Sequence, residues 1–132
     1  MIPRGIRNNN PGNIKKSKTK WFGKIEGDDA VFETFDTMEH GIRALLAILR
    51  TYIEKHKLHT IEEIIKRFAP SSENNTEAYV RAVCRDSGFD RDTILFFDRE
   101  DMLPLTIAII KHENGGLHGI TNEQVEKGWE AI

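Results

Sequence analysis

The chain has 132 residues, of which 39% are hydrophobic and 30% are charged, and its formal net charge is −2. This length allows one domain, residues 1–132, with a core that needs no disulfide or metal ion. The slightly negative charge argues against a global field that would hold a polyanion. The single cysteine, Cys84, excludes an internal disulfide, and its helix-like surroundings predict a buried, unreactive thiol.

No stretch of the chain is apolar and long enough to act as a secretory signal or to span a membrane. We therefore expect a protein that is made in the bacterial cytoplasm and makes no membrane contact. A small single domain of this composition is expected to be a monomer. If it acts outside the cell, another factor must carry it there.

Residues 4–14 read RGIRNNNPGNI, a polar stretch framed by Ile6 and Ile14. Asparagine favours caps and turns, and Pro-Gly favours a turn, so this stretch predicts a loop held against the core. Fixed side-chain amides offer donors and acceptors to a sugar or a peptide. A solvated loop is the alternative. The four lysines in Lys15–Lys20 are typical of a solvated loop, and at most they would help to hold an anionic polymer.

Residues 21–35 predict a β-hairpin, because two short runs of aromatic and β-branched residues flank a turn at residues 26–29. Such a sheet is too small to form a core of its own. Helices follow it along the rest of the chain, with apolar residues at three- and four-residue spacing. Their predicted capping residues are Asp36 with Glu39, Thr60 with Glu63, Thr76, Asp101, and Thr121 with Gln124. The predicted ends of the first three helices are His56, Pro70 and Gly88.

The fourth predicted helix carries the clearest functional signal. Residues 102–110 are apolar nearly all round, which predicts a helix buried in the middle of the domain, with Pro104 in its first turn. Gly115 and Gly116 then end the helix just after Glu113. We expect the helix dipole and the apolar surroundings to favour a protonated Glu113. A protonated carboxyl is the general acid that glycosidic cleavage requires. A solvated glutamate beyond a frayed helix end is the alternative.

Two other carboxylates compete for a catalytic role. Glu73 lies in a polar loop among amides, and Asp29 lies at the tip of the hairpin. Residues in such places more often serve as caps or turn residues. The five histidines are scattered and form no complete ligand set, so we expect no metal and no cofactor. Phosphate-binding, G-x-S-x-G and Cys–His motifs are missing from the sequence.

Several motifs occur in a fixed order from one end of the chain to the other. They are RGIRNNNPGNI, WFG, F-x-T-F with GIRA, AP-x-SENNT-x-x-Y, and AIIKHENG. In this order the sequence resembles a family of phage and prophage proteins that are often labelled as structural or virion proteins. The resemblance implies a phage context, with other virion proteins as candidate partners. It implies little chemistry.

A second resemblance is to the autolysin-type glucosaminidases and lytic transglycosylases of the lysozyme superfamily. Residues 9–14 are similar to their N-N-x-x-G-I loop, residues 69–83 to their segment with a tyrosine, and residues 112–115 to the end of the helix with the catalytic glutamate. In this chain the glutamate motif comes last instead of first. The changed order implies a circular permutation of the lysozyme-like fold, which is tolerated where chain termini lie close together.

These resemblances imply a mainly α (α+β) lysozyme-like domain with one small hairpin, which cleaves the glycan strand of peptidoglycan at the cell wall. Glu113 would be the acid, Tyr79 would orient substrate or stabilise charge, and Glu73 would be a second candidate acid. The implied substrate-binding residues are Asn8, Asn9, Asn10, Asn13, Asn75 and Asn114. Because no partner carboxylate stands out, a transglycosylase is favoured over a two-carboxylate hydrolase.

Two other classes of function compete with this interpretation. A virion structural or wall-binding protein would keep the fold and the groove without the activity. A small helical DNA-binding domain would use the lysines of residues 15–20, but the negative net charge argues against nucleic acid as a partner. The sequence leaves open which glycosidic bond is cut, and whether the protein is packaged in the virion or released at lysis.

Overall fold

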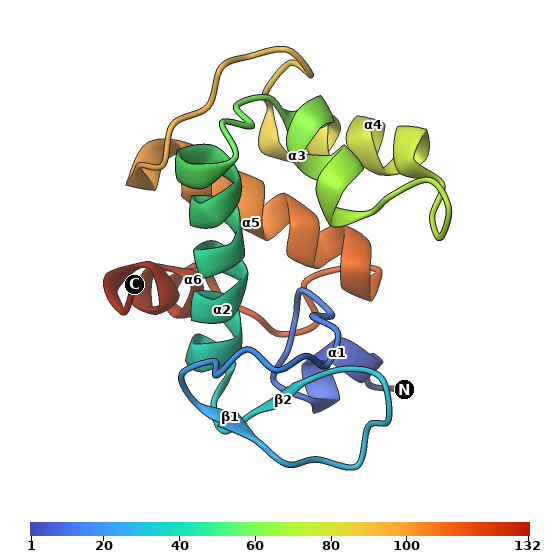
Figure 1. Ribbon diagram of the computed structural model, residues 1–132, viewed down its shortest axis with the longest axis vertical. Helices are drawn as coiled ribbons and strands as arrows, with labels where there is room; N and C mark the ends of the chain where they lie inside the picture. Colours follow the sequence, from blue (N-terminus) through green and yellow to red (C-terminus); the bar gives the residue numbers. More distant parts are fainter.

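The computed structural model describes residues 1–132 and is mainly helical, with one small antiparallel sheet (Figure 1). Its elements in chain order are α1 (Arg4–Arg7), β1 (Lys24–Ile25), β2 (Thr34–Phe35), α2 (Met38–Arg50), the π-helix η1 (Thr51–Lys55), α3 (Ile61–Phe68), α4 (Thr76–Ser87), α5 (Arg99–Asn114) and α6 (Asn122–Glu130). The predicted combination of helices with one small hairpin is confirmed. None of the helices has both the length and the apolar character that crossing a membrane requires.

Helix α5 lies at the centre of the molecule and contacts α1, α2, α4 and α6. In Figure 1 it runs between the α3–α4 pair and the N-terminal segment. Its central apolar residues are buried, as the sequence predicts. The helix begins earlier than predicted, because Asp98 instead of Asp101 accepts the capping bond, from the Asp101 N–H at 2.9 Å. Pro104 consequently lies in the second turn instead of the first.

The other helix starts agree with the predicted caps to within one residue. Both hydrogen bonds of the capping box are present at the start of α3, between Thr60 and Glu63, and at the start of α6, between Thr121 and Gln124. At α4 the capping side chain is that of Asn75, one residue before the predicted Thr76. Threonine and asparagine are both favoured capping residues, so the pattern alone does not separate neighbouring candidates.

At α2 the capping side chain is Thr37, whose hydroxyl accepts a bond from the His40 N–H at 3.2 Å. The predicted cap, Asp36, instead contacts the His40 ring, with its Oδ1 2.5 Å from the His40 Nδ1. The α-helix ends at Arg50, and the rest of the predicted helix continues as the wider π-helical turn η1. The apolar stripe survives this change, since Ile53 is still buried in the core.

The hairpin pairs Lys24 with Phe35 and Ile25 with Thr34 in antiparallel register. Each strand is only two residues long, and residues 26–33 connect them, so the turn is longer than predicted. The Lys24 ammonium forms an ion pair with Glu33 at 2.9 Å, and the Glu33 side chain is only 2% exposed. Because this sheet is so small, such polar contacts hold the N-terminal part of the chain in place.

The N-terminal stretch begins with a single helical turn, α1, where a continuous loop was predicted. Beyond it the chain forms the predicted loop, with left-handed backbone at Asn9 and Asn13. This loop crosses α2 so closely that a Cβ added at Gly41 would lie 1.8 Å from the Asn9 carbonyl oxygen. Ile6 and Ile14 pack against the core, as predicted.

The two chain termini lie on opposite sides of the molecule in Figure 1. A circular permutation connects termini that lie near each other on the surface. In this structure the termini are therefore not close together, as the implied circular permutation would require. A longer connection would be needed to relate the two orders of motifs.

Gly41 provides a test of the contact between the N-terminal loop and α2. In an ordinary helix interior, replacing glycine with alanine stabilises the helix by roughly 1 kcal/mol. Here we expect Gly41→Ala to destabilise the protein by about 2 kcal/mol, because the added Cβ would clash with the Asn9 carbonyl. Urea unfolding measures the difference. Ala47→Gly on the same helix is the control and should cost roughly 1 kcal/mol; a stabilising Gly41→Ala would contradict the close contact.

Candidate active site

Glu113 lies in the last turn of α5, which ends at Gly115 in left-handed conformation. Its Oε2 accepts a hydrogen bond from the Tyr79 hydroxyl at 2.7 Å. Its Oε1 accepts a hydrogen bond from the Asn13 side-chain amide at 2.9 Å. The N-terminal loop, α4 and α5 therefore meet at one partly exposed carboxyl group, and the predicted proximity of Glu113 and Tyr79 is confirmed.

The Tyr79 side chain is held tightly in the core, with only 2% of the residue exposed. Its ring packs against His112 with centroids 3.8 Å apart, and edge-on against Phe68 at 6.5 Å. Burial, followed by the charge of Glu113 and the hydrogen bond to it, raises the pKa of the Tyr79 hydroxyl well above its usual range. The hydroxyl consequently stays protonated and remains a donor to Glu113.

Asn114 is buried behind this site, where it connects α5 with the N-terminal loop. Its side-chain amide donates to the Pro11 carbonyl at 2.8 Å and to the Ile110 carbonyl at 2.9 Å. A Cβ added at Gly5 would lie 2.6 Å from the Asn13 Oδ1 and 2.7 Å from the Asn114 Oδ1. Gly5 therefore has to lack a side chain for the two asparagines to approach α1.

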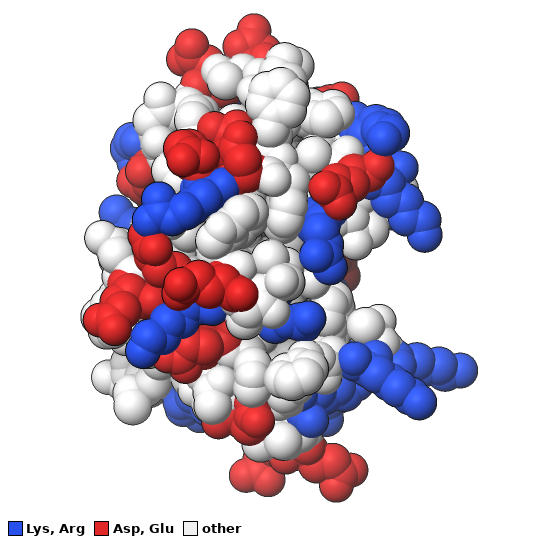
Figure 2. Space-filling view, turned by 90° about the vertical axis from the view of Figure 1, so that its left-hand side faces the viewer, with Lys and Arg blue, Asp and Glu red and all other residues white.

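A cleft of about 400 Å³ opens over Glu113. Its lining residues are Gly12, Asn13, Ile14, Lys15, Phe32, Ile48, Tyr52, Phe68, Ala69, Glu73, Asn74 and Glu113. The N-terminal part of the chain lies on one side, and the end of α3 and the next loop lie on the other; α2, η1 and α5 contribute Ile48, Tyr52 and Glu113. Figure 2 shows a hollow at its right-hand edge between an upper and a lower lobe, with Lys and Arg side chains on both lips.

Glu73 lines the same cleft as Glu113. Its side chain is 55% exposed and forms an ion pair with Lys15 at 2.8 Å. Lys15 belongs to the N-terminal part of the chain, so this pair links the two sides of the cleft. The structure thus brings a second carboxylate to the opening.

Asn8, Asn9 and Asn10 of the N-terminal loop lie behind the cleft instead of on its floor. The Asn8 amide donates to Asp29 at 3.0 Å, and the Asn9 amide donates to the Phe35 carbonyl at 3.1 Å. Asn10 is fully buried, and its amide donates to two backbone carbonyls while its Oδ1 accepts from a backbone N–H. These side chains replace backbone pairing that an irregular loop lacks. They and Asn75, the α4 cap, are absent from the cleft lining.

Asp29 forms a structural ion pair with Arg4 and is not a second acid at the cleft. Arg4 binds both of its carboxylate oxygens, at 2.5 and 2.7 Å, and only 7% of the Asp29 side chain is exposed. The Arg4 guanidinium holds the pKa of Asp29 well below its usual range. The same guanidinium lies 4.7 Å from the centroid of the Phe32 ring. The pair fastens the hairpin connection to α1.

Sequence reasoning missed the aromatic side chains that line the cleft. Phe32, Tyr52 and Phe68 each line it, from the β1–β2 connection, η1 and α3. In the sequence each fits the apolar pattern of its own strand or helix, which predicts core positions and gives no sign of a shared opening. Lys15 belongs to a run of lysines that predicts a solvated loop, which would at most help to hold an anionic polymer. Only the tertiary structure brings these residues together.

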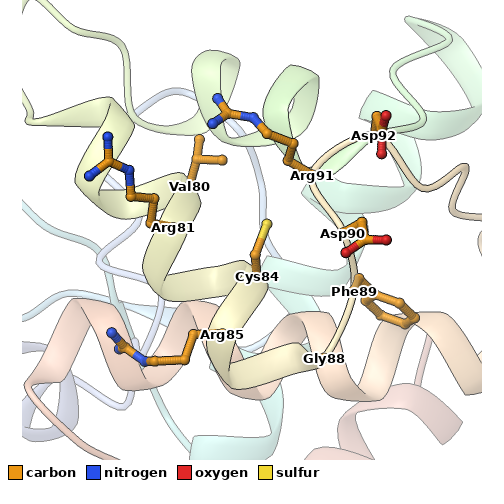
Figure 3. Close-up of a pocket in the computed structure, with 9 residues that line it drawn as sticks. All are labelled: Val80, Arg81, Cys84, Arg85, Gly88, Phe89, Asp90, Arg91 and Asp92. Carbon is orange, nitrogen blue, oxygen red and sulfur yellow. The ribbon is translucent and has the colours of Figure 1, made fainter.

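A larger hollow, of about 580 Å³, lies between α4 and the following loop (Figure 3). Arg81 and Arg85 extend away from Cys84 in Figure 3, and the three lining arginines are paired with neighbouring carboxylates. Cys84 is half-buried, where full burial was predicted, and burial raises the pKa of its thiol. No group of side chains in the protein is arranged to hold a metal ion.

The match to a known protein covers nearly the whole chain. The chain is 44% identical over 132 residues to Protein P5 of Pseudoalteromonas phage PM2. The match covers 96% of this chain and 80% of that protein. No protein-family model matches the chain.

Arg91 joins α3 to α4 through ion pairs with Glu62 and Glu77. Its guanidinium donates to Glu77 at 2.8 and 2.9 Å and to Glu62 at 3.0 Å. The hydrogen bonds from Arg91 to Glu77 are the main reason why the pKa of Glu77 is lowered from 4.5 to about 2. A lowered pKa in the folded state stabilises the protein above about pH 4.5, and this contribution is lost as the pH falls toward 2.

We therefore expect Arg91→Met to destabilise the protein at pH 6, with a difference from the parent that shrinks by pH 2.5. Urea unfolding at both pH values measures this difference. Arg7→Met is the control, because Arg7 is exposed and forms no salt bridge. A difference between Arg91→Met and the parent that stays constant with pH would contradict the assigned ion pairs.

Proposed function

The chain belongs to the family of Protein P5 of Pseudoalteromonas phage PM2, and from this phage context and the Glu113 site we propose that it cleaves the glycan strands of peptidoglycan. The observation that carries the proposal is the Glu113 carboxyl, held by Tyr79 and Asn13 beside an open cleft. Glycosidic cleavage needs such a group within reach of the leaving oxygen. Aromatic side chains in the cleft supply flat apolar surfaces for sugar rings.

Glu113 would protonate the glycosidic oxygen as the bond between two sugars breaks. Tyr79 and Asn13 act on the carboxyl instead of on the sugar, because each donates to one of its oxygens. They fix its orientation, and correct orientation of a catalytic group lowers the barrier to reaction. Asn114 acts one step further back, since it ties the N-terminal loop to α5. Contacts with substrate would come from Phe32, Phe68 and Asn74 in the cleft lining.

A single acid is sufficient for a transglycosylase. After the bond breaks, a hydroxyl of the same sugar attacks the anomeric carbon and gives its proton to Glu113, which forms an anhydro ring and restores the acid. In a two-carboxylate hydrolase, Glu73 would instead assist an attacking water. The Lys15 ammonium already engages Glu73, and the Glu73 side chain is exposed on a loop. We favour the transglycosylase for this reason.

A non-catalytic virion or wall-binding protein is the second candidate. It is favoured by the fact that both Glu113 oxygens already accept hydrogen bonds from the protein. In that case the carboxyl would be a brace between the N-terminal loop, α4 and α5. The two candidates differ in what removal of the charge changes, activity in one case and stability in the other.

Glu113→Gln tests the two candidates directly. We expect this variant to lose lysis of purified peptidoglycan sacculi by a factor of 100 or more, since general acid catalysis contributes about 10²–10⁴-fold. Its fold should remain, because glutamine keeps the shape of the side chain and the acceptor for Tyr79. Turbidity clearing and thermal unfolding measure both effects. Glu130→Gln, at an exposed position, is the matched control.

If Glu113→Gln lyses sacculi as fast as the parent, the catalytic role of Glu113 is wrong. A parent that never lyses sacculi, together with a strongly destabilised Glu113→Gln, would instead support the structural brace.

Glu73→Gln separates the two enzymatic mechanisms. We expect the variant to lose less than about tenfold in rate and to leave anhydro ends on its products, because Glu73 serves the cleft only through its pair with Lys15. Mass spectrometry of the released fragments identifies the ends. Loss as complete as in Glu113→Gln, with reducing ends in the parent's products, would show a two-carboxylate hydrolase.

A further inference from the structure

A cationic segment borders the cleft on its N-terminal side. We call residues 15–20 the basic rim, after its four lysines, all of which are exposed. Lys15 is paired with Glu73, but no salt bridge joins Lys16, Lys18 or Lys20 to an acidic side chain. Lys and Arg side chains project from the lower lip of the hollow in Figure 2. In a protein of net charge −2, the rim is thus a local patch of uncompensated positive charge.

The backbone of the rim is held in place by the side chains of Lys24 and Glu33. The Lys24 ammonium donates to the Ser17 carbonyl at 2.9 Å and to the Thr19 carbonyl at 3.1 Å. It also pairs with the buried Glu33, which accepts a hydrogen bond from the Ser17 N–H at 3.2 Å. A solvated loop would need none of these contacts. The fold fixes the backbone of the rim while its lysine side chains point outward.

The rim connects two hollows of the surface. Lys15 lines the cleft together with Glu113. Lys18 and Lys20 line a second hollow of about 330 Å³, which also includes Trp21 and Ile25. The cationic side chains of the rim therefore line both hollows. Trp21 adds an aromatic ring beside them.

We propose that the basic rim binds anionic groups of a polymer whose backbone lies in the Glu113 cleft. This inference rests on the proposed function, and it defines the substrate as an anionic wall polymer. The bound groups would be carboxylates of stem peptides or phosphates of wall-linked polymers, because ammonium groups attract both. Since the rest of the surface carries a net negative charge, such a polymer approaches with its charged groups toward the rim.

The test is made in the Glu113→Gln background, so that binding is measured without cleavage. Lys16→Gln/Lys18→Gln/Lys20→Gln should weaken co-sedimentation with intact sacculi about tenfold at physiological salt, and should flatten the dependence of binding on salt. The matched control is Lys55→Gln/Lys57→Gln/Lys127→Gln, whose lysines line neither hollow. It should bind within twofold of the parent. Circular dichroism confirms that both triple variants are folded.

Two treated substrates identify the bound group. Sacculi stripped of stem peptides by an amidase should bind about tenfold more weakly if the rim binds carboxylates. Sacculi stripped of wall phosphate polymers by acid should do so if it binds phosphates. Binding by the parent that survives both treatments, or equal binding by parent and rim variant, overturns the proposal. Capture of duplex DNA through the rim, with sacculus binding unchanged, also overturns it.

The outcomes for the rim and for the proposed function are separable. Rim-dependent binding without any lysis by the parent would leave the subsite standing and remove the enzymatic proposal. If the rim variant lyses sacculi at the same rate and with the same salt dependence as the parent, the enzymatic proposal stands and the rim subsite is removed.

Discussion

The hydrogen bonds at Glu113 are the constraint on which the rest of the structure depends. They join the N-terminal loop to α5 through Asn13, and α4 to α5 through Tyr79. Asn114 repeats the first connection one residue later, with its amide on the Pro11 carbonyl. A polar group at the boundary of a core is stable only when its partners are in place. The cleft walls are therefore positioned by the same contacts that orient the carboxyl.

The asparagines of the N-terminal loop have a structural role that follows from the chemistry of irregular backbone. A loop leaves N–H and C=O groups without regular partners, and buried groups of this kind must be paired. Asn10 supplies both a donor and an acceptor in the interior, and Asn9 supplies a donor to the end of β2. The side-chain amides that suggest a sugar site in the sequence instead form hydrogen bonds within the protein itself. Asn13 alone among them reaches the cleft.

The features that depend on local chemistry could be predicted from the sequence. The capping boxes of α3 and α6, the buried α5 and the hairpin follow from neighbouring residues, and all are present. The cleft depends on which distant elements pack together, and no local pattern encodes that. Lys15 and Phe68 therefore could not be assigned to one opening, and Asp29 could not be recognised as a partner of Arg4.

The contact between Asn114 and Pro11 also has a consequence for biosynthesis. The two residues are 103 positions apart in the chain, so their contact cannot form on the ribosome until α5 has emerged from the exit tunnel. Domains are assembled as the chain is synthesised, and contacts between distant segments form late. The Glu113 site is then absent from a nascent chain whose α5 segment is still inside the exit tunnel. A host cell that is producing this protein therefore meets the assembled site only in chains whose α5 has left the ribosome.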